Sequence, residues 1–431
     1  MISSSQKKII LFSKNTIKKK NYSHNIFSYF AIFQNNPGTC LLKTIIDKKR
    51  YLDLMTSYFK HVYGIKNTRL NFSNYINKKN KYKNIIVSWA FKDNFKSNGV
   101  YHDKYLKKDS SKTKSTIWFL IYMDEKLPEK VDNNIILVHR KNNFFSGLIF
   151  FFNYFFFCLK KYFIGVNFFK KFNVYSAFSN QVIEIYKKNV DLENIKFFFI
   201  TYEGQIFQKD LIKYNKNYNP DIENIAYDHS APPPMPLNLI YDNFSPDILY
   251  ITGSAQEKFY RKHLLWPKKK IKLTKSLRFQ NEKKINYINK MFLPFELYSE
   301  KKYLENLFYL FKQKKLNLKD YQIKKHPLKL KDKKHINFVN KINEINHAPQ
   351  NKKIKEVSSI FFGQTTAIII ALEFGVNCYH ICTNPVFDSY SATLWPDIKV
   401  HQINNNIFKY ELKKRKTFIN FSSKKKISNL C

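Results

Sequence analysis

Cysteine, glycine and arginine are all scarce in this chain of 431 residues. The five cysteines are odd in number and scattered along the sequence, at Cys40, Cys158, Cys378, Cys382 and Cys431. This usage indicates neither a disulfide framework nor a zinc module, and it favours a reducing, cytoplasmic compartment. With nine glycines and 14 prolines, collagen-like and elastic low-complexity classes are excluded.

Acidic residues are outnumbered, because 32 aspartates and glutamates stand against 75 lysines and arginines, a net charge of +43. Only six of the basic residues are arginines, whose planar guanidinium group forms paired hydrogen bonds with bases and phosphates. The lysines spread over the whole chain together with Asn, Ile, Phe and Tyr, which share A/T-rich codons, so a biased genome accounts for the charge. We therefore expect no specific nucleic-acid partner, while attraction to acidic lipid head groups stays open.

No segment has the pattern of a membrane-spanning helix or a signal peptide. The most apolar run, Leu148–Leu159, is interrupted by Asn153 and followed by two lysines, and it falls short of the ~20 residues that a spanning helix needs. We interpret it as a buried helix. The alternative is a helix in the membrane interface, at the inner face of the membrane, with basic side chains toward the head groups: Lys160, Lys161, Lys170 and Lys171.

The chain is rich enough in apolar residues, at 44%, to build buried cores, and its length suggests two or three domains of roughly 100–200 residues each. Short β-rich runs recur, each followed by a turn and a helical pattern, and they predict parallel βαβ units in an α/β fold. The predicted strands are residues 85–91, 116–123, 135–138, 195–201, 224–227, 247–252, 272–277, 321–325, 357–362 and 376–382.

A proline run interrupts this series at residues 231–236 (APPPMP), where regular structure must break. We therefore expect two α/β domains that meet near residues 236–246, an N-terminal one of residues 1–240 and a C-terminal one of residues 246–431. Residues 1–75 show weak periodicity and are left without assignment. The tail after Ile407 is interpreted as a helix followed by a basic end.

Polar side chains follow two consecutive predicted strands, at the carboxyl ends where open α/β sheets bind ligands. Glu203 lies in the turn after residues 195–201, and His229 follows the next strand, so we expect both to face one cleft. A carboxylate there can act as a general base. Its purely structural alternative is an acidic residue that stabilises the dipole of the next helix.

Two further turns carry groups suited to phosphate. His326-Pro327 ends the strand 321–325, where the histidine can hold a phosphate oxygen or can simply be an ordinary surface residue. The turn Gly363-Gln364-Thr365-Thr366 precedes a helix whose first amides are unpaired. Plain helix capping is the alternative role of its threonines.

Motifs for several other chemistries are absent from the sequence. No two aspartates stand at i and i+2, so the D-x-D metal clamp is missing, and no phosphate-binding P-loop, G-x-G-x-x-G, H-E-x-x-H or G-x-S-x-G occurs. Cys378 and Cys382 lack a second pair of ligands. We expect neither a metal site nor a cofactor.

Five segments carry a resemblance to a known family, and in order they read ITYEGQIFQKDLI, IAYDHSAPPPMP, ILYITGSAQEKF, KKHPLK and FFGQTTAIIIALEFGVNCYHI. They resemble a family of bacterial surface-carbohydrate biosynthesis proteins, of O-antigen or capsule type. That family has the GT-B glycosyltransferase architecture, two Rossmann-type domains facing across a cleft. The motif set is also similar to that of bacterial sialyltransferases and transferases of 3-deoxy-octulosonic acid. The resemblance covers about residues 195–385 of the 431.

The resemblance implies a metal-independent, inverting glycosyltransferase that moves a sugar from a nucleotide-sugar donor to a glycan or lipid-linked acceptor. Glu203-Gly204 would match the base motif, His326-Pro327 the His-Pro motif that touches the nucleotide phosphate, and Thr365-Thr366 a hydroxyl pair on the same phosphate. Tyr202 replaces an acidic residue that often precedes the base motif, and threonine replaces serine in the pair. The nucleotide, CMP or else UDP, GDP or CDP, therefore stays open.

Two other hypotheses compete with glycosyl transfer. A CDP-polyol phosphotransferase of teichoic-acid type would share the GT-B outline and would use His229 as its base. A basic protein without catalysis that binds RNA or anionic membranes would depend on the net charge alone.

Overall fold

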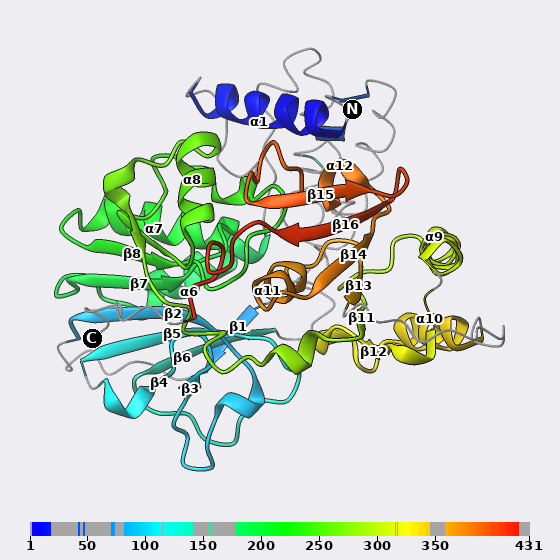
Figure 1. The fold of residues 1–431 in the computed structure, drawn as a ribbon. Helices are drawn as coiled ribbons and strands as arrows, with labels where there is room; N and C mark the ends of the chain where they lie inside the picture. Colours follow the sequence, from blue (N-terminus) through cyan, green and yellow to red (C-terminus); the bar gives the residue numbers. More distant parts are fainter. Residues whose placement is uncertain are drawn as a thin grey trace.

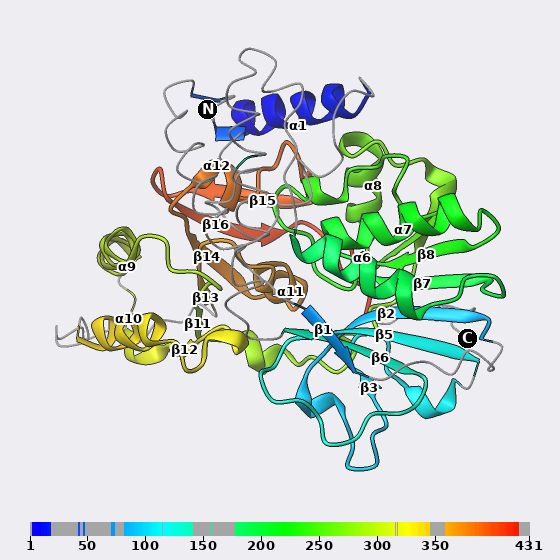
Figure 2. The ribbon, with the colours of Figure 1, turned by 180° about the vertical axis from the view of Figure 1, so that it is seen from behind.

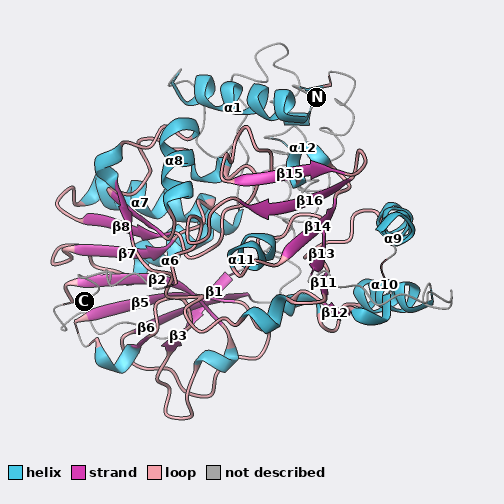
Figure 3. Ribbon diagram, in the orientation of Figure 1, coloured by secondary structure: helices cyan, strands magenta, loops and turns pink. Residues whose placement is uncertain are grey.

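The protein was analysed as a computed structural model, which describes residues 2–18, 42–43, 46–47, 70–73, 82–113, 115–140, 156, 177–314, 316, 318–344 and 358–421. The apolar run Leu148–Leu159 and its lysines lie outside these residues, apart from Phe156. Among the described residues, no helix has both the length and the apolar character needed to cross a membrane. Two large sheets form the body of the molecule (Figures 1 and 3). The predicted α/β class is confirmed.

The first sheet has eight strands in the order β1-β6-β5-β2-β7-β8-β9-β10. All neighbours are parallel except the edge strand β1, which runs antiparallel to β6. The strands are β1 (Leu70–Ser73), β2 (Asn84–Ala90), β5 (Thr116–Tyr122), β6 (Ile135–Arg140), β7 (Phe197–Thr201), β8 (Glu223–Tyr227), β9 (Ile248–Ile251) and β10 (Ile271–Leu273). From β2 the chain winds outward through β5 and β6, and it then continues from β7 to β10 on the other side. The switch point therefore lies between β2 and β7, whose carboxyl ends form the usual ligand crevice of such sheets.

Both faces of the first sheet are buried, which is why its strands are nearly continuous apolar runs. One set of alternating residues, including Ile85 and Val87, packs with the helices α6 (Ala177–Asn189) and α7 (Ile206–Tyr218). The opposite set, including Ile86 and Trp118, packs with residues around a short hairpin of β3 (His102–Asp103) and β4 (Lys108–Asp109). The hairpin thus covers this face of the sheet, a position that helices usually occupy in parallel α/β sheets.

The second sheet has six strands in the order β12-β11-β13-β14-β16-β15. The first four are parallel, and β16 runs antiparallel to both of its neighbours. The strands are β11 (Lys290–Phe292), β12 (Gln322–Lys324), β13 (Ser358–Phe362), β14 (Asn377–Ile381), β15 (Ile398–Gln402) and β16 (Ile407–Leu412). Helices α9 (Glu300–Lys314) and α10 (Lys333–Glu344) cover one face, while α11 (Ala367–Glu373) lies on the face toward the first sheet (Figures 1 and 2).

The two sheets share one apolar core and several hydrogen bonds across their junction. The Phe259 ring of α8 (Ser254–His263) stacks on Trp395, with 4.2 Å between the ring centroids. Tyr390 Oη donates to the carbonyl oxygen of Pro232 at 2.8 Å, and Trp395 Nε1 donates to that of Pro234 at 2.8 Å. The proline run is therefore part of the contact between the sheets and not an exposed linker.

The first helix, α1 (Ile2–Lys18), also spans the junction. Gln6 Nε2 donates to the carbonyl oxygen of Ser389, next to α12 (Pro385–Asp388), at 2.8 Å. Lys14 Nζ donates to the carbonyl oxygen of Lys262 in α8 at 3.2 Å. A segment left without assignment from sequence thus contacts both halves of the molecule.

The chain returns to the first sheet after β16. In this return segment (residues 413–421), the Glu373 carboxylate accepts the amides of Phe418 at 2.6 Å and Ile419 at 3.1 Å. The amide of Asn420 donates to the carbonyl oxygen of Thr252 at 2.9 Å, just after β9. The backbone of Gly253 approaches the segment so closely that a Cβ atom there would lie 2.1 Å from the Phe418 carbonyl oxygen.

The end of the chain and the junction between the sheets differ from what the sequence predicts. The tail after Ile407 was expected to be helical, and this is wrong because Ile407–Leu412 is strand β16. Residues 408–412 alternate apolar and charged side chains, which is the period of a half-buried strand. The first sheet also continues to Leu273, beyond the expected junction near residues 236–246, and the change of sheet falls between Leu273 and Lys290. The division into two domains stays a prediction.

Candidate functional site

The turn after β7 holds Glu203 in a tightly bonded loop. Gln208, in the first turns of α7, accepts the amides of Glu203 at 2.9 Å and Gln205 at 3.1 Å and donates to the carbonyl oxygen of Thr201 at 2.7 Å. Gly204 has a left-handed backbone, with φ of 65°, and its missing Cβ would lie 2.2 Å from the carbonyl oxygen of Asn238. This explains why the turn needs glycine directly after the acidic residue.

The Glu203 carboxylate lies beside His229, which follows β8. The distance from Glu203 Oε1 to His229 Nε2 is 3.5 Å. The Glu203 side chain is 25% exposed, whereas the His229 side chain is fully buried. Glu203 and His229, which we expected to face one cleft, thus lie side by side at neighbouring strand ends, and only Glu203 reaches the surface.

Burial sets the protonation of this pair. It raises the pKa of the Glu203 carboxyl above its usual value, although a hydrogen bond from Gln205 Nε2 at 2.8 Å and the charge of Arg278 counteract part of the rise. Burial also lowers the pKa of His229 well below its usual value, and Arg278 lowers it further. His229 is thus neutral at neutral pH, and the carboxylate beside it is a stronger base than an exposed one.

His229 is covered by the hairpin between β2 and β5. The Tyr105 ring lies over the imidazole, with 4.2 Å between the ring centroids. Asp103 fixes this turn, because its carboxylate accepts the amides of Tyr105 and Leu106 at 2.7 Å each. Within the described residues, neither ring nitrogen of His229 makes a hydrogen bond. A buried imidazole with no hydrogen bond is costly, which favours a functional reason for its presence.

Asp228 lies directly before His229 and is 1% exposed. Its carboxylate accepts from Tyr260 Oη at 2.7 Å and from the amide and hydroxyl of Ser230 at 3.3 and 3.1 Å. Burial, with a smaller contribution from the charge of Glu203, raises the pKa of Asp228 from 3.8 to about 6 against the opposing effect of the hydrogen bonds from Tyr260 and Ser230.

Asp228 should therefore make stability depend on pH. Because its pKa is higher in the folded state, protonation favours folding below about pH 4, and this contribution is lost as the pH rises through 6. Relative to Asp228→Asn, the free energy of unfolding of the wild type should fall by about 2 kcal/mol between about pH 4 and pH 7. Urea denaturation at several pH values measures this difference. Asp221→Asn, at an exposed aspartate before β8, should track the wild type, and parallel curves for Asp228→Asn and the wild type would contradict the assignment.

Arg278 is the cation of the site, and the sequence reasoning missed it. Its guanidinium carbon lies 5.2 Å from the centre of the Tyr105 ring and 5.1 Å from that of Phe279. The main chain beside it is held by Tyr227 Oη, which accepts the amide of Leu277 at 2.9 Å. The side chain is exposed, and no ion pair among the described residues involves it. The one available signal was its rarity, as one of six arginines in a lysine-rich chain.

The second sheet contributes His326, which follows β12. Its Nδ1 accepts the amide of Leu328 at 3.3 Å, so the neutral ring carries its proton on Nε2. Burial, with smaller effects from the charges of His335, Lys329 and Arg278, lowers the pKa of His326 to about 4. At neutral pH His326 is therefore an N–H donor and not a cation. Pro327 is the first residue of the short 3₁₀ helix η9 (Pro327–Lys329) that His326 caps.

The turn at residues 363–366 fits the phosphate expectation less well. The Gly363 amide donates to the carbonyl oxygen of Ile381 at 2.8 Å, so the sheet already uses it. Thr365 Oγ1 accepts the amide of Ala367 at 3.3 Å, the N-cap residue Thr366 makes no side-chain cap hydrogen bond, and α11 has only seven residues. Gln364, Thr365 and Thr366 are all half-buried. Their hydrogen bonds within the described residues do not join them to Glu203 or His326.

The structure thus connects Glu203, His229 and Tyr105 with Arg278, whose charge also acts on His326 from the second sheet. Among the described residues, no three His, Cys, Asp or Glu side chains gather in a way that could hold a metal ion.

Comparison with models of known protein families and with curated protein sequences finds no match to this chain.

Proposed function

We propose that the protein is an inverting glycosyltransferase that takes a sugar from a nucleotide-sugar donor. One observation carries the proposal: Glu203, a partly exposed carboxylate at the switch point of a mainly parallel sheet, lies 3.5 Å from a buried neutral histidine. The charge of Arg278, which forms no ion pair within the described part of the chain, also acts on it. A base and a cation at one crevice suit a reaction in which a hydroxyl loses a proton while a phosphate departs.

The proposed reaction is a single displacement. The acceptor hydroxyl gives its proton to Glu203 as its oxygen forms a bond to the anomeric carbon of the donor sugar. The bond from that carbon to the nucleotide phosphate breaks, and its electron pair leaves on the phosphate oxygen. Arg278 and the Nε2–H group of His326 would stabilise the negative charge there. The two sheets would then serve the acceptor and the donor in the manner of a GT-B enzyme.

Exposure favours Glu203 over His229 as the base. A base must reach the proton that it removes, and the His229 ring is fully buried behind the carboxylate and Tyr105. His229 instead keeps the region around Glu203 apolar and uncharged, which maintains the high basicity of the carboxylate. Transfer of a CDP-activated polyol phosphate with His229 as the base is therefore the less favoured reaction.

The acceptor in this proposal is a glycan or a lipid-linked sugar of the cell surface, handled on the cytoplasmic side of the membrane. The lysine-rich character of the chain supports work close to anionic lipids. Analysis of the product, a glycoside in contrast to a phosphodiester, tests the reaction type directly.

Donor binding provides a test that is independent of turnover. His326→Ala and Arg278→Gln should each weaken the affinity for the nucleotide by about tenfold, since each removes one charged or polar contact to phosphate. Thermal-shift titrations with CMP, CDP, UDP and GDP identify the nucleotide, because a ligand of the folded state raises its melting temperature.

One control variant accompanies this test. Arg261→Gln removes an exposed arginine of α8 whose ion pair among the described residues is with Glu257, at 3.4 Å, and it should leave nucleotide affinity unchanged. If both site variants bind the preferred nucleotide as tightly as the wild type, the donor does not lie between Arg278 and His326.

A further inference from the structure

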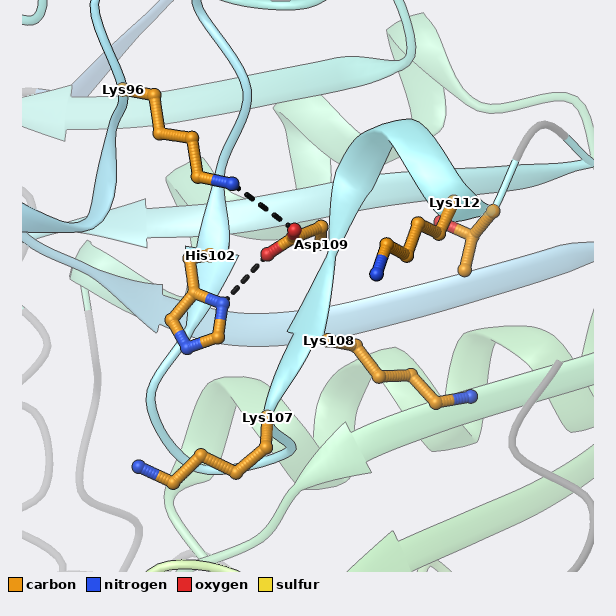
Figure 4. Close-up of a pocket in the computed structure, with 7 residues that line it drawn as sticks. Lys96, His102, Lys107, Lys108, Asp109 and Lys112 are labelled. Carbon is orange, nitrogen blue, oxygen red and sulfur yellow. Dashed lines mark hydrogen bonds and ion pairs between the residues drawn. The ribbon is translucent and has the colours of Figure 1, made fainter.

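A second concentration of charge lies at the β3–β4 hairpin, and Glu203 is not among the residues that line it. A cavity of about 450 Å³ opens beside the hairpin of β3 and β4 (Figure 4). The charged side chains that line it are Lys96, His102, Lys107, Lys108, Asp109 and Lys112. Four lysines and a histidine therefore line the cavity together with one carboxylate.

That carboxylate is already engaged. Asp109 Oδ2 lies 3.1 Å from Lys96 Nζ, and Asp109 Oδ1 lies 2.6 Å from His102 Nδ1 (Figure 4). The hydrogen bond from His102 is the largest influence that lowers the pKa of Asp109, and Lys96 adds to it. Within the described residues neither Lys107 nor Lys112 forms an ion pair, so the cavity keeps an excess of positive charge.

The backbone at this place is also unusual. Lys107 has φ of 56°, a left-handed conformation that a residue with a Cβ adopts at a cost of about 1–2 kcal/mol. The turn is held there by Asp103, whose carbonyl oxygen accepts the Lys107 amide at 2.8 Å. Glycine or asparagine would relieve the strain, yet the position carries a lysine that lines the cavity. Strain kept in this way is typical of functional positions.

A lysine-rich composition alone does not explain this arrangement. Lysines scattered over a convex surface repel one another weakly, because water and salt screen them. Several ammonium groups around one hollow repel more strongly unless an anion lies between them. The ammonium group is a compact charge that binds phosphate oxygens without requiring a planar partner.

We propose that this cavity binds phosphate groups, as a diphosphate or a cluster of phosphomonoesters. The positive charge of its lining residues is larger than a ligand with a single carboxylate could neutralise. Its volume is sufficient for two phosphates. The cavity lies on the same hairpin as Tyr105 but is distinct from the Glu203–His229 pair. The inference does not depend on the proposed glycosyl transfer.

Calorimetric titration of the full chain with inorganic pyrophosphate, at constant ionic strength, tests the site. Lys107→Gln combined with Lys112→Gln should lower the affinity of one binding event by at least about tenfold or remove it. Arg278→Gln should leave that event intact, which separates the cavity from the proposed donor site.

The matched control is Lys268→Gln combined with Lys269→Gln, which removes the same charge from two exposed residues of η6 (Lys268–Lys270). The control should titrate as the wild type does. Equal losses in both double variants, or no loss in either, would overturn the proposal because only non-specific attraction would then remain. Circular dichroism confirms that each variant is folded.

Vesicles distinguish the source of the phosphate. If the ligand is a lipid head group, the cavity variant should also lose binding to phosphatidylcholine vesicles that contain phosphatidylglycerol, and the control variant should not. If only pyrophosphate binding is lost, the cavity takes a soluble phosphate compound. Both results support a phosphate site.

Discussion

Replacing Glu203 with glutamine is expected to reduce the turnover number for sugar transfer by about 10²–10⁴-fold, the usual contribution of a general base. Glutamine keeps the shape of the side chain and its contact with Gln205, but it cannot accept the acceptor proton. Nucleotide affinity should stay near that of the wild type, because the proposed phosphate contacts come from Arg278 and His326. A radiolabelled or coupled transfer assay together with nucleotide titration measures both quantities.

The pH profile adds a second readout for the same variant. The raised pKa of Glu203 means that wild-type kcat/KM should fall as the pH decreases through that pKa, since the protonated carboxyl cannot act as a base. Glu203→Gln should lose this acidic limb. Glu223→Gln, at the amino end of β8 and thus at the opposite edge of the sheet, should retain both the rate and the limb. Unchanged turnover in Glu203→Gln would remove this residue from the mechanism.

Replacing Gly253 with alanine is expected to lower the free energy of unfolding by about 3 kcal/mol, at the upper end of the cost of overpacking. The added Cβ would lie 2.1 Å from the carbonyl oxygen of Phe418 and 2.4 Å from that of Thr417. Both obstructing atoms are main chain, so the return segment must move as a whole and lose its hydrogen bonds to Thr252 and Ala255. Guanidinium denaturation followed by tryptophan fluorescence measures the loss.

A second glycine offers the control for this prediction. At Gly375 a Cβ would also meet a near neighbour, but that neighbour is the guanidinium end of Arg415, which can swing away. Gly375→Ala should therefore cost less, about 1 kcal/mol, mainly from its left-handed φ of 71°. Equal losses at the two positions would show that the return segment is not held rigidly.

Local sequence pattern was sufficient for much of the parallel framework. Strands β7, β8, β13 and β14 are short runs of aromatic and branched residues that end in turns, and each was predicted close to its observed place. Strand β16 was mistaken for a helix because its alternation of apolar and charged residues spans only a few positions. Helix α1 was not predicted, since it is positioned by contacts with α8 and with the residues next to α12, which are distant in the sequence.

The sequence predicted one part of the candidate site and not the other. Glu203 and His229 follow adjacent parallel strands, and such strands bring their carboxyl ends to one edge of the sheet. Tyr105 and Arg278 could not be inferred in this way. Tyr105 reaches His229 from an inserted hairpin, and Arg278 comes from the connection between the sheets, so the position of each depends on contacts with distant segments.

The carbonyl groups of Pro232 and Pro234 are acceptors at fixed positions between the two sheets, because each proline ring locks its own backbone φ. Their partners, Tyr390 and Trp395, precede β15, at one edge of the second sheet, while His326 follows β12 at the opposite edge. A rotation of the second sheet that kept these two hydrogen bonds would displace the edge at β15 little and the edge at β12 more. The separation of His326 from Arg278 would therefore change more than the contacts of Tyr390 and Trp395 with the proline run.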